Sequence, residues 1–414
     1  MKTELIKYKA ELENELNSIL SYWMKYTPDQ VNGGFIGKID HQNRKDEKAP
    51  KGSVLNSRIL WSFSSAYNLT GNQQYLDVAN RAYEYLASHF IDKEFGGVYW
   101  TVDYKGRPLD TKNQVYALSF AVYALSEYHK STSNEAAKDL AIKIYQKIVE
   151  HSYEKRYGGY IEALTKDWKE MKDLRLSGKD ANERKSMNTH LHVLEAFTNL
   201  YRIWPQDVLR QQLHELVQLF LKYIISGDNH HLLLFFDDRW NPKSKLISYG
   251  HDIEAAWLLH EATELLNNSL LSMEVQNKSP LLIEAAARGL DRDGGLWYEY
   301  DPANRKLVRE KHSWPQAEAM VGFFHGWEIT GLKKYFDQSV KSWAFIKNHI
   351  KDSDFGEWNW GVYEDYSPMA KEDKVGIWKC PYHNSRACIE LIRRISKRLE
   401  ELQSMKTKLP DKCQ

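Results

Sequence analysis

Three histidines at related positions are the side chains of this sequence best suited to chemistry near neutral pH. His190, His251 and His383 each stand close to the start of a segment with helical periodicity. A neutral imidazole acts as a general base or donates a hydrogen bond to a developing oxyanion. Because the partial positive charge at a helix N-terminus disfavours imidazolium, these histidines are expected to be neutral. Their pattern indicates proton transfer.

Other polar or aromatic residues occupy the same place in the remaining segments of this kind. They are Arg58, Tyr116 and Trp314, and the six positions follow one another at intervals of about 58 to 74 residues. Residues at the same place in successive units of a closed ring point to the same end of that ring. We therefore expect all six side chains to meet in one cavity at the mouth of a barrel.

Carboxylates accompany these residues. Glu254 follows His251 by three positions and Glu318 follows Trp314 by four, so each pair shares a helix face. The carboxylates could orient histidines or bind sugar hydroxyls, and ordinary salt bridging within a helix explains them equally well. Together with Asp252 they could also supply the two acids of a glycosidase. A glycosidase, however, does not need three convergent histidines.

Metal and nucleotide chemistry fit the sequence poorly. His251 and Glu254 have a spacing compatible with metal binding, but the HExxH pattern and a Cys/His cluster are both absent from the sequence. No GxGxxG motif follows a strand pattern, and there is no GxxxxGK[ST] motif. We expect neither a metal nor a cofactor.

A turn followed by alternating residues recurs along the chain and must position these side chains. The copies are NGGFIGKID (32–40), FGGVYWTVD (95–103), YGGYIEALT (157–165), GGLWYEYD (294–301) and FGEWNWGVYED (355–365). A degenerate copy, HLLLFFDDRW (231–240), fills the remaining gap if Leu233 marks the turn. Gly-Gly supplies the positive φ of a tight turn, so each copy predicts a short hairpin.

Two helical patterns lie between successive turns. The predicted helices are 4–27, 53–70, 73–90, 111–130, 134–151, 186–203, 206–226, 248–268, 276–290, 312–330, 333–349 and 379–405. Six pairs of helices predict an all-α (α/α)6 barrel with inner and outer rings, formed as a single domain by residues 1–414. The alternative is an open helical solenoid. Closure is favoured because 379–405 would pair with 4–27 and leave no helix alone.

The composition limits the partners and the compartment. Lys and Arg number 57 against 56 Asp and Glu, with no basic stripe, so neither nucleic acid nor a membrane is expected as a partner. The N-terminus lacks the apolar core of a secretory signal. Three cysteines without a framework spacing, Cys380, Cys388 and Cys413, indicate reduced thiols in the cytoplasm. A monomer or weak homodimer with a small-molecule substrate is expected.

Several stretches resemble the cellobiose 2-epimerases, a group within the N-acylglucosamine 2-epimerase superfamily. They are NSRILW (56–61), DYKGRPLDTKNQVYALSFAVYALSEY (103–128), MNTHLHVLEAFTNLY (187–201), ISYGHDIEAAWLLHEA (247–262), WPQAEAMVGFF (314–324) and WKCPYHNSRACIE (378–390). The resemblance covers nearly the whole chain in order. It implies an (α/α)6 barrel that epimerises C2 of the reducing-end glucose of β-1,4-linked disaccharides to mannose, without a cofactor.

The resemblance also implies roles for individual residues. His251 and His383 match the acid/base pair, and His190 matches a third histidine near the C1 and C2 oxygens. The substrate-binding residues that it implies are Arg58, Tyr116, Asn188, Glu254, Trp257, Trp314, Glu318 and Trp378. Relatives carry two tryptophans before the PQAE stretch, whereas Ser313 replaces the first of them here. This departure weakens any inference about the outer sugar pocket.

Three alternatives remain at this point. A relative acting on free mannose and glucose, or an aldose–ketose isomerase, would share the proton chemistry. A glycoside hydrolase or lyase could use the same barrel. A sugar-binding or scaffold protein without catalysis would bind sugar but exchange no C2 hydrogen.

Overall fold

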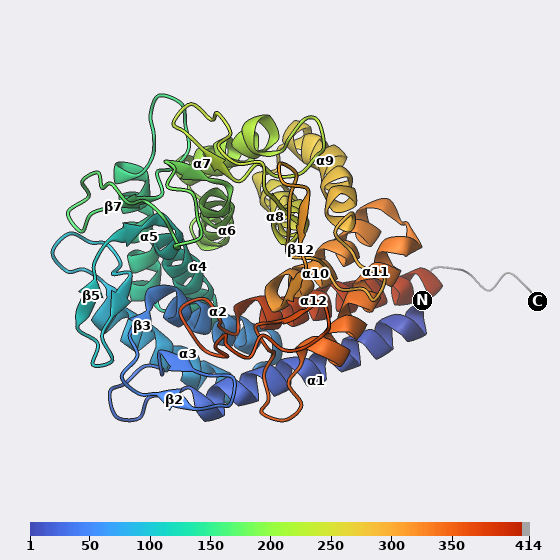
Figure 1. Ribbon diagram of the computed structural model, residues 1–414, viewed down its shortest axis with the longest axis horizontal. Helices are drawn as coiled ribbons and strands as arrows, with labels where there is room; N and C mark the ends of the chain where they lie inside the picture. The colour runs from blue at the N-terminus through green and yellow to red at the C-terminus, as the bar shows by residue number, and fades with distance from the viewer. Residues whose placement is uncertain (408–414) are drawn as a thin grey trace, which may run out of the picture.

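The computed structural model describes residues 1–407, which form helices in two concentric rings (Figure 1). The inner helices are α2 (Ser53–Thr70), α4 (Val115–Thr132), α6 (Met187–Ile203), α8 (Tyr249–Leu266), α10 (Ser313–Thr330) and α12 (Tyr382–Thr407). The outer helices are α1 (Lys2–Tyr26), α3 (Gln73–Tyr85), α5 (Glu135–His151), α7 (Asp207–Leu219), α9 (Ser269–Ala287) and α11 (Lys333–Phe345). Helices α3, α7 and α11 continue into the π-helical turns Leu86–Phe90, Phe220–Ile224 and Ile346–Ile350.

The ring is closed. Each inner helix packs against the next one, and the last inner helix, α12, packs against the first, α2. Helix α12 also packs against α1, which is the pairing predicted for residues 379–405 and 4–27. These contacts confirm the predicted (α/α)6 barrel and exclude an open solenoid.

The burial of the two kinds of helix matches their places in the rings. In α4 every residue from Val115 to Tyr128 is buried, because an inner helix is surrounded by protein on nearly all sides. In α3 the buried residues are Tyr75, Ala79, Ala82 and Tyr85, a single stripe with helical spacing. Outer helices therefore cover the inner ring with one face and leave the other to solvent.

Short antiparallel strands join neighbouring repeats at the end of the ring where the inner helices begin. They are β1 (Lys38–Ile39), β2 (Lys45–Asp46), β3 (Lys51–Gly52), β4 (Thr101–Val102), β5 (Pro108–Asp110), β6 (Asn113–Gln114), β7 (Ala163–Leu164), β8 (Lys185–Ser186), β9 (Phe235–Phe236), β10 (Ile247–Ser248), β11 (Glu299–Asp301), β12 (Lys306–Val308), β13 (Glu310–His312) and β14 (Gly361–Tyr363). Strands β3, β6, β8, β10 and β13 each directly precede an inner helix and pair with a strand of the following repeat. This linkage holds the starts of neighbouring inner helices in register.

The predicted turns are present, with one marker misplaced. Gly33, Gly96, Gly158, Gly294 and Gly356 all have positive φ values, as the Gly-Gly pattern predicted. In the degenerate repeat the equivalent residue is not Leu233. His230 adopts the left-handed conformation there, with φ +64°. The prediction failed because no glycine marks this turn.

Helix α9 also differs from its predicted bounds. It begins at Ser269, where Asn268 caps it by accepting a hydrogen bond from Leu271 N, whereas the sequence pattern predicted a start at residue 276. Pro280 lies inside the helix, although proline usually ends one. Within residues 1–407, no helix combines the length and apolar character needed to cross a bilayer.

Candidate active site

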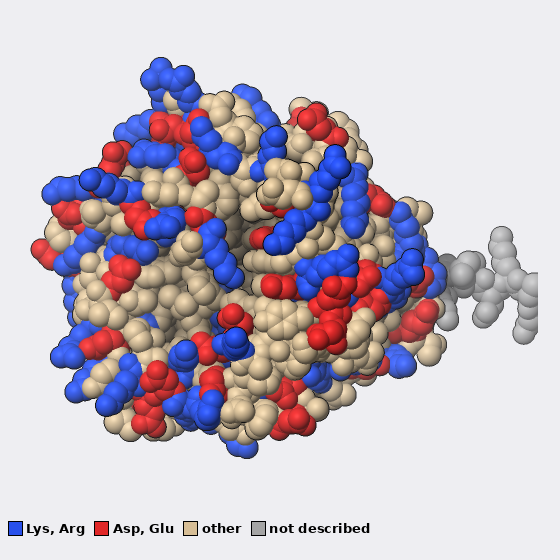
Figure 2. All heavy atoms as spheres, in the orientation of Figure 1, with Lys and Arg blue, Asp and Glu red and all other residues tan. Residues whose placement is uncertain are grey.

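The first three turns of all six inner helices contribute to one connected group of polar and aromatic side chains. This barrel-mouth cluster comprises Arg58 (α2), Tyr116 and Phe120 (α4), His192 and Glu195 (α6), His251 and Glu254 (α8), Trp314 and Glu318 (α10), and Tyr382, His383 and Arg386 (α12). The face shown in Figure 2 is hollowed at its centre, inside the ring of helices. The structure thus brings together five of the six residues predicted from the repeat.

Two of the predicted histidines lie next to the indole of Trp314. The ring centroid of His251 lies 4.7 Å from that of Trp314, and the ring centroid of His383 lies 5.5 Å from it. His251 Nδ1 is hydrogen-bonded to Ser248 Oγ at 2.7 Å, and His383 Nδ1 to Glu318 Oε1 at 2.7 Å. Because each Nδ1 is engaged, Nε2 is the nitrogen that each histidine can offer to a bound molecule.

Both histidines are held in the neutral form. Burial, with a smaller contribution from the charge of His192, lowers the pKa of His251 to about 3. Burial also lowers the pKa of His383 well below the usual value, and the positive charges of Arg58 and Arg386 lower it further. A neutral imidazole has a free lone pair and can therefore accept a proton.

Arg386 lies at the centre of the carboxylates of the cluster. Its Nη1 donates to Glu195 Oε1, while its Nη2 donates to Glu254 Oε1 at 2.5 Å and to Glu318 Oε1 at 2.7 Å. All four side chains are at most 4% exposed. The structure therefore explains the candidate carboxylates as parts of a buried ionic network, which sequence patterns alone did not reveal.

The ionic network shifts the pKa values of its carboxyl groups in opposite directions. Burial by itself would raise the pKa of Glu195, but the charge of Arg386 and the hydrogen bond with His192 lower this pKa to about 2. Burial raises the pKa of Glu254, and repulsion from Glu318 raises it further. Glu254 Oε2 has no hydrogen-bond partner within residues 1–407, so it could accept a bond from a ligand or donate one when protonated.

Arg58 is the second arginine of the cluster. Its Nη2 donates to Tyr116 Oη at 2.7 Å, and its guanidinium lies 4.2 Å from the ring centroid of Phe120 and 4.7 Å from that of Tyr382. A guanidinium held between aromatic faces keeps its charge and its direction. Arg58 can therefore present fixed donors to an anionic oxygen.

His190 lies outside the cluster, although sequence reasoning placed it there. Its Nδ1 is bonded to Ser186 O at 2.6 Å, and its Nε2 accepts from Tyr160 N at 2.9 Å. With both ring nitrogens bound to backbone groups and the ring packed 5.0 Å from that of Trp240, His190 has no free nitrogen for chemistry. It serves to connect α6 with the preceding hairpin.

His192, which sequence reasoning missed, takes that place in the cluster. Its Nδ1 is hydrogen-bonded to Glu195 Oε2 at 2.9 Å, and its ring lies 4.9 Å from that of Tyr116. Helical phase explains the difference: on an inner helix, positions four and seven residues apart share the inward face. Residues 188, 192 and 195 have this spacing, whereas residue 190 points away from it.

The remaining predicted residues lie at different depths. Trp378 is partly exposed, with its ring 6.1 Å from that of Tyr116 and 5.6 Å from that of Trp100, and it can offer a flat apolar surface. Trp257 is only 1% exposed and donates through Nε1 to Glu318 Oε2 at 3.2 Å. Trp257 therefore orients Glu318 through this hydrogen bond and is not accessible to a ligand.

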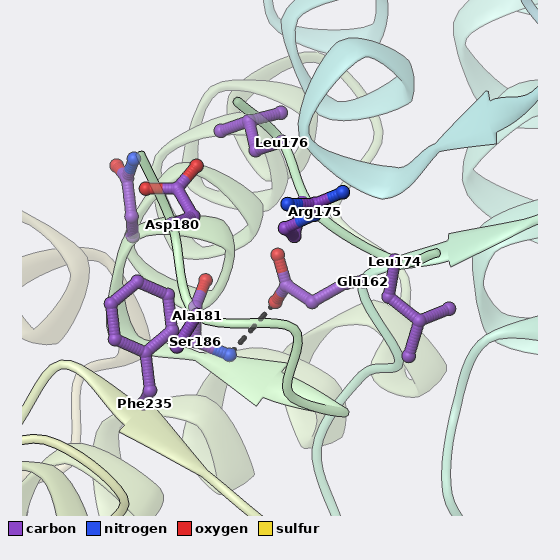
Figure 3. Close-up of a pocket in the computed structure, with 9 residues that line it drawn as sticks. Glu162, Leu174, Arg175, Leu176, Asp180, Ala181, Ser186 and Phe235 are labelled. Atoms are coloured by element: carbon purple, nitrogen blue, oxygen red, sulfur yellow. Dashed lines mark hydrogen bonds between the residues drawn. The ribbon is translucent and has the colours of Figure 1, made fainter. Parts of the chain in front are cut away.

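Asn188 lies beside a small cavity of about 20 Å³. The cavity is lined by Asn188 together with Glu162, Leu174, Ser186 and Phe235 and neighbouring residues (Figure 3). Glu162 is anchored there by Ser186 N, which donates to Glu162 Oε1 at 2.8 Å. The side-chain oxygen of Asn188 has no partner within residues 1–407. Asn188 is the second residue of α6, as Tyr116 is of α4, and its free side-chain oxygen can accept a hydrogen bond from a further group.

One grouping in the cluster has the composition of a metal site. Glu254, Glu318 and His383 each offer one ligand atom, and these atoms lie within 4.8 Å of one another. The Nη2 of Arg386 already contacts both carboxylates, so a guanidinium supplies the positive charge that an ion would otherwise provide. The donor set therefore fits an internal ion pair better than a metal ion.

Comparisons with known proteins agree with this fold. The family model of N-acylglucosamine 2-epimerase (GlcNAc 2-epimerase) matches residues 33–387. The cellobiose 2-epimerase of Bacteroides fragilis is 48% identical over 385 residues, which are 93% of this chain and 98% of that protein. The solved structure of cellobiose 2-epimerase from Bacillus thermoamylovorans superposes with a TM-score of 0.90 at 37% identity, covering 94% of this chain and 99% of that chain.

A more distant structure shares the fold alone. A D-mannose isomerase superposes with a TM-score of 0.82 at 22% identity, covering 93% of this chain and 97% of that chain. The match of the family model to most of the chain, together with relatives well above 30% identity, identifies the enzyme class as isomerase. The chain therefore belongs to the N-acylglucosamine 2-epimerase family and is a sugar 2-epimerase.

Proposed function

We propose that this epimerase inverts C2 of the reducing-end sugar of β-1,4-linked disaccharides such as cellobiose, interconverting glucose and mannose at that end. The observation that carries the mechanism is the pair of neutral histidines, His251 and His383, whose rings both lie next to that of Trp314, at 4.7 Å and 5.5 Å. The name of the B. fragilis relative, 48% identical over nearly its whole length, supports the substrate.

The reaction needs two bases on opposite faces of one carbon. In the open-chain sugar the C1 carbonyl makes the proton on C2 acidic. The Nε2 of one neutral histidine removes this proton and leaves a cis-enediolate. The negative charge of the enediolate favours protonation of the second histidine by solvent, and this histidine then delivers that proton to the opposite face of C2, while the first histidine returns its proton to solvent. The roles of His251 and His383 exchange when the reaction runs backwards.

Two hydrogen-bond donors of the cluster, Arg58 and His192, stabilise the intermediate. Negative charge develops on the C1 and C2 oxygens as the proton leaves, and donors that are already oriented stabilise that charge without reorganising. Arg58 is fixed by Tyr116 and two aromatic rings, and His192 is fixed by Glu195. We assign these two side chains to the enediolate oxygens.

The carboxylates act by orienting the histidines. Glu318 accepts from His383 Nδ1, which leaves the lone pair of Nε2 for the substrate. Both Glu254 and Glu318 are 1% exposed and bind the same guanidinium nitrogen. This arrangement disfavours a glycoside hydrolase, in which two carboxyl groups must face the substrate from opposite sides of the scissile bond.

The two neighbouring histidines of α6 should respond differently to substitution. His190→Ala leaves Tyr160 N and Ser186 O without their partner, so we expect a loss of about 1–3 kcal/mol in the free energy of unfolding and an unchanged kcat per folded molecule. His192→Ala should lower kcat by about 10²-fold, because a donor to the oxyanion is lost. Urea unfolding and steady-state kinetics measure both effects, and a kcat loss in His190→Ala equal to that in His192→Ala would contradict this division.

The pH dependence follows from the depressed histidine pKa values. Since the pKa of His251 is lowered to about 3, the acid limb of kcat/KM should lie well below pH 6.5, the ordinary histidine value. The unfolded chain binds more protons than the folded one in this range, so stability is fully present above about pH 6.5 and declines as the pH falls. Kinetics from pH 4.5 to 8, with circular dichroism to monitor folding, test this, and an acid limb above pH 6.5 would count against it.

The length of the substrate is tested by comparing sugars. Trp314 and Trp378 offer two partly exposed aromatic surfaces, which suits a substrate with two rings. Ser313, in place of the first of two tryptophans, is the observation that favours the alternative of a free mannose or glucose substrate. We expect kcat/KM for cellobiose and mannobiose to exceed that for mannose and N-acetylmannosamine. A preference for mannose would assign the chain to the monosaccharide alternative while leaving the C2 chemistry unchanged.

A further inference from the structure

Glu357 occupies a position that is glycine in four of the six repeats. The backbone oxygens of Gly34, Gly97, Gly159, Gly295 and Glu357 accept the same type of turn hydrogen bond, from the N–H groups of Asp29, Asp92, Glu154, Asp291 and Asp352. Glu357 has φ +66°, in the left-handed region that a side chain disfavours, and Gly34 and Gly159 have similar values of +60° and +86°. Interactions of the glutamate side chain must therefore offset the cost of a backbone conformation that suits glycine.

The carboxylate of Glu357 is fully used. Its Oε1 accepts from Lys379 Nζ at 2.9 Å and from Asn384 Nδ2 at 2.6 Å, and its Oε2 accepts from Trp23 Nε1 at 2.5 Å. Glu357, Lys379 and Asn384 are 4%, 7% and 4% exposed, so these bonds are shielded from water. Trp23 belongs to α1, and the carboxylate thereby joins the sixth hairpin to an outer helix as well.

Lys379 and Asn384 bracket the segment that completes the active site. Between them, Cys380 Sγ lies 3.7 Å from Arg58 Nη1, Tyr382 donates to Glu195, and His383 reaches Glu318. Trp378 directly precedes this segment. One carboxylate thus holds both ends of the stretch that connects the sixth hairpin to the first turn of α12.

We propose that Glu357 is a positioning residue for His383, retained in a strained backbone conformation because its carboxylate fixes residues 379–384 against the rest of the barrel mouth. It touches no part of the substrate and acts through Lys379 and Asn384. The inference rests on the proposed role of His383 in proton transfer. It goes beyond that role because it assigns a function to the departure of one repeat from the glycine pattern.

Two substitutions of Glu357 distinguish the effect of its strained backbone from the effect of its carboxylate hydrogen bonds. Glu357→Gly introduces the residue found in four other repeats and relieves the backbone, but removes the bonds to Lys379 and Asn384. Glu357→Gln keeps the shape of the side chain and one oxygen that accepts hydrogen bonds. We expect kcat for C2 epimerisation to fall by about 10- to 100-fold in Glu357→Gly, with KM changed much less, and to fall less in Glu357→Gln. The ring ¹⁵N resonances of His383 should also shift in Glu357→Gly, in the absence of any sugar.

Asp29→Asn is the matched control. Asp29 pairs with the buried Lys51 at 2.8 Å in the first hairpin, with side chains only 4% and 1% exposed, but holds no part of residues 379–384. This variant should lose stability like Glu357→Gln and keep the kcat and the His383 resonances of the unsubstituted protein. Unchanged kcat and His383 resonances in both Glu357 variants would overturn the proposal, as would an equal kcat loss in Asp29→Asn. If the proposed substrate is wrong, the unsubstituted protein will be inactive toward cellobiose. In that case kcat of the variants is compared on mannose, and the His383 resonances, which need no sugar, still test the role of Glu357.

Discussion

Replacing His383 with alanine should lower kcat for C2 epimerisation by roughly 10²–10⁴-fold, the range that positioned general acid–base groups contribute. The same loss is expected for His251→Ala, because each histidine serves one face of C2 and neither can replace the other. His383 is only partly exposed and anchored to Glu318 at 2.7 Å, so its Nε2 has one direction in which to act. Single-turnover kinetics on the purified variants measure the loss without interference from product release.

The control for these variants is a histidine outside the barrel mouth. His214 lies on the outer helix α7, so His214→Ala should retain the kcat of the unsubstituted protein. Circular dichroism and thermal unfolding establish that His251→Ala and His383→Ala are folded. Turnover within a few-fold of the parent in either folded variant would refute the mechanism of two opposed bases.

Arg386→Leu should produce the largest loss of stability. Removing the guanidinium leaves Glu195, Glu254 and Glu318 buried together without their shared counter-charge, and breaking a buried ion pair on one side costs about 3–5 kcal/mol. Arg386→Lys keeps the charge but cannot bridge the carboxylates with two nitrogens, so an intermediate loss is expected. Urea unfolding at pH 7 gives the free energy of unfolding for each variant.

A surface pair provides the comparison for Arg386. Arg398 pairs with Glu401 at 2.9 Å, with both side chains about two-fifths exposed, so Arg398→Leu should change the free energy of unfolding by no more than about 1 kcal/mol. Arg386→Leu should also abolish turnover in any fraction that remains folded, because Glu318 and Glu195 orient His383 and His192. Equal stability of Arg386→Leu and Arg398→Leu would mean that the carboxylates of the cluster do not depend on Arg386.

The fold was largely predictable because it is a repeat. Six turns and twelve helical segments, counted from the sequence, already favour a closed ring once 379–405 is paired with 4–27. The errors fell where the local signal was weak. His230 replaced the expected glycine in one turn, and α9 starts at Ser269 because Asn268 caps it and Pro280 is tolerated inside it.

The candidate site was predictable in part, and the limit was helical phase. Counting residues from each turn identified the right ends of the right helices, but on α6 it selected His190, where inward-facing positions spaced by four would have selected His192. Arg386 was missed for another reason. One arginine among several in α12 becomes informative only when three carboxylates from three other helices are known to converge on it.

The most direct test of the proposed chemistry is proton NMR of cellobiose incubated with the protein in heavy water. If two histidines exchange the C2 proton with solvent through an enediolate, the epimerised product should carry deuterium at C2 of the reducing-end sugar, and neither His251→Ala nor His383→Ala should produce it. An epimerised product that retains the original hydrogen at C2, with no deuterium from the solvent, would contradict the account.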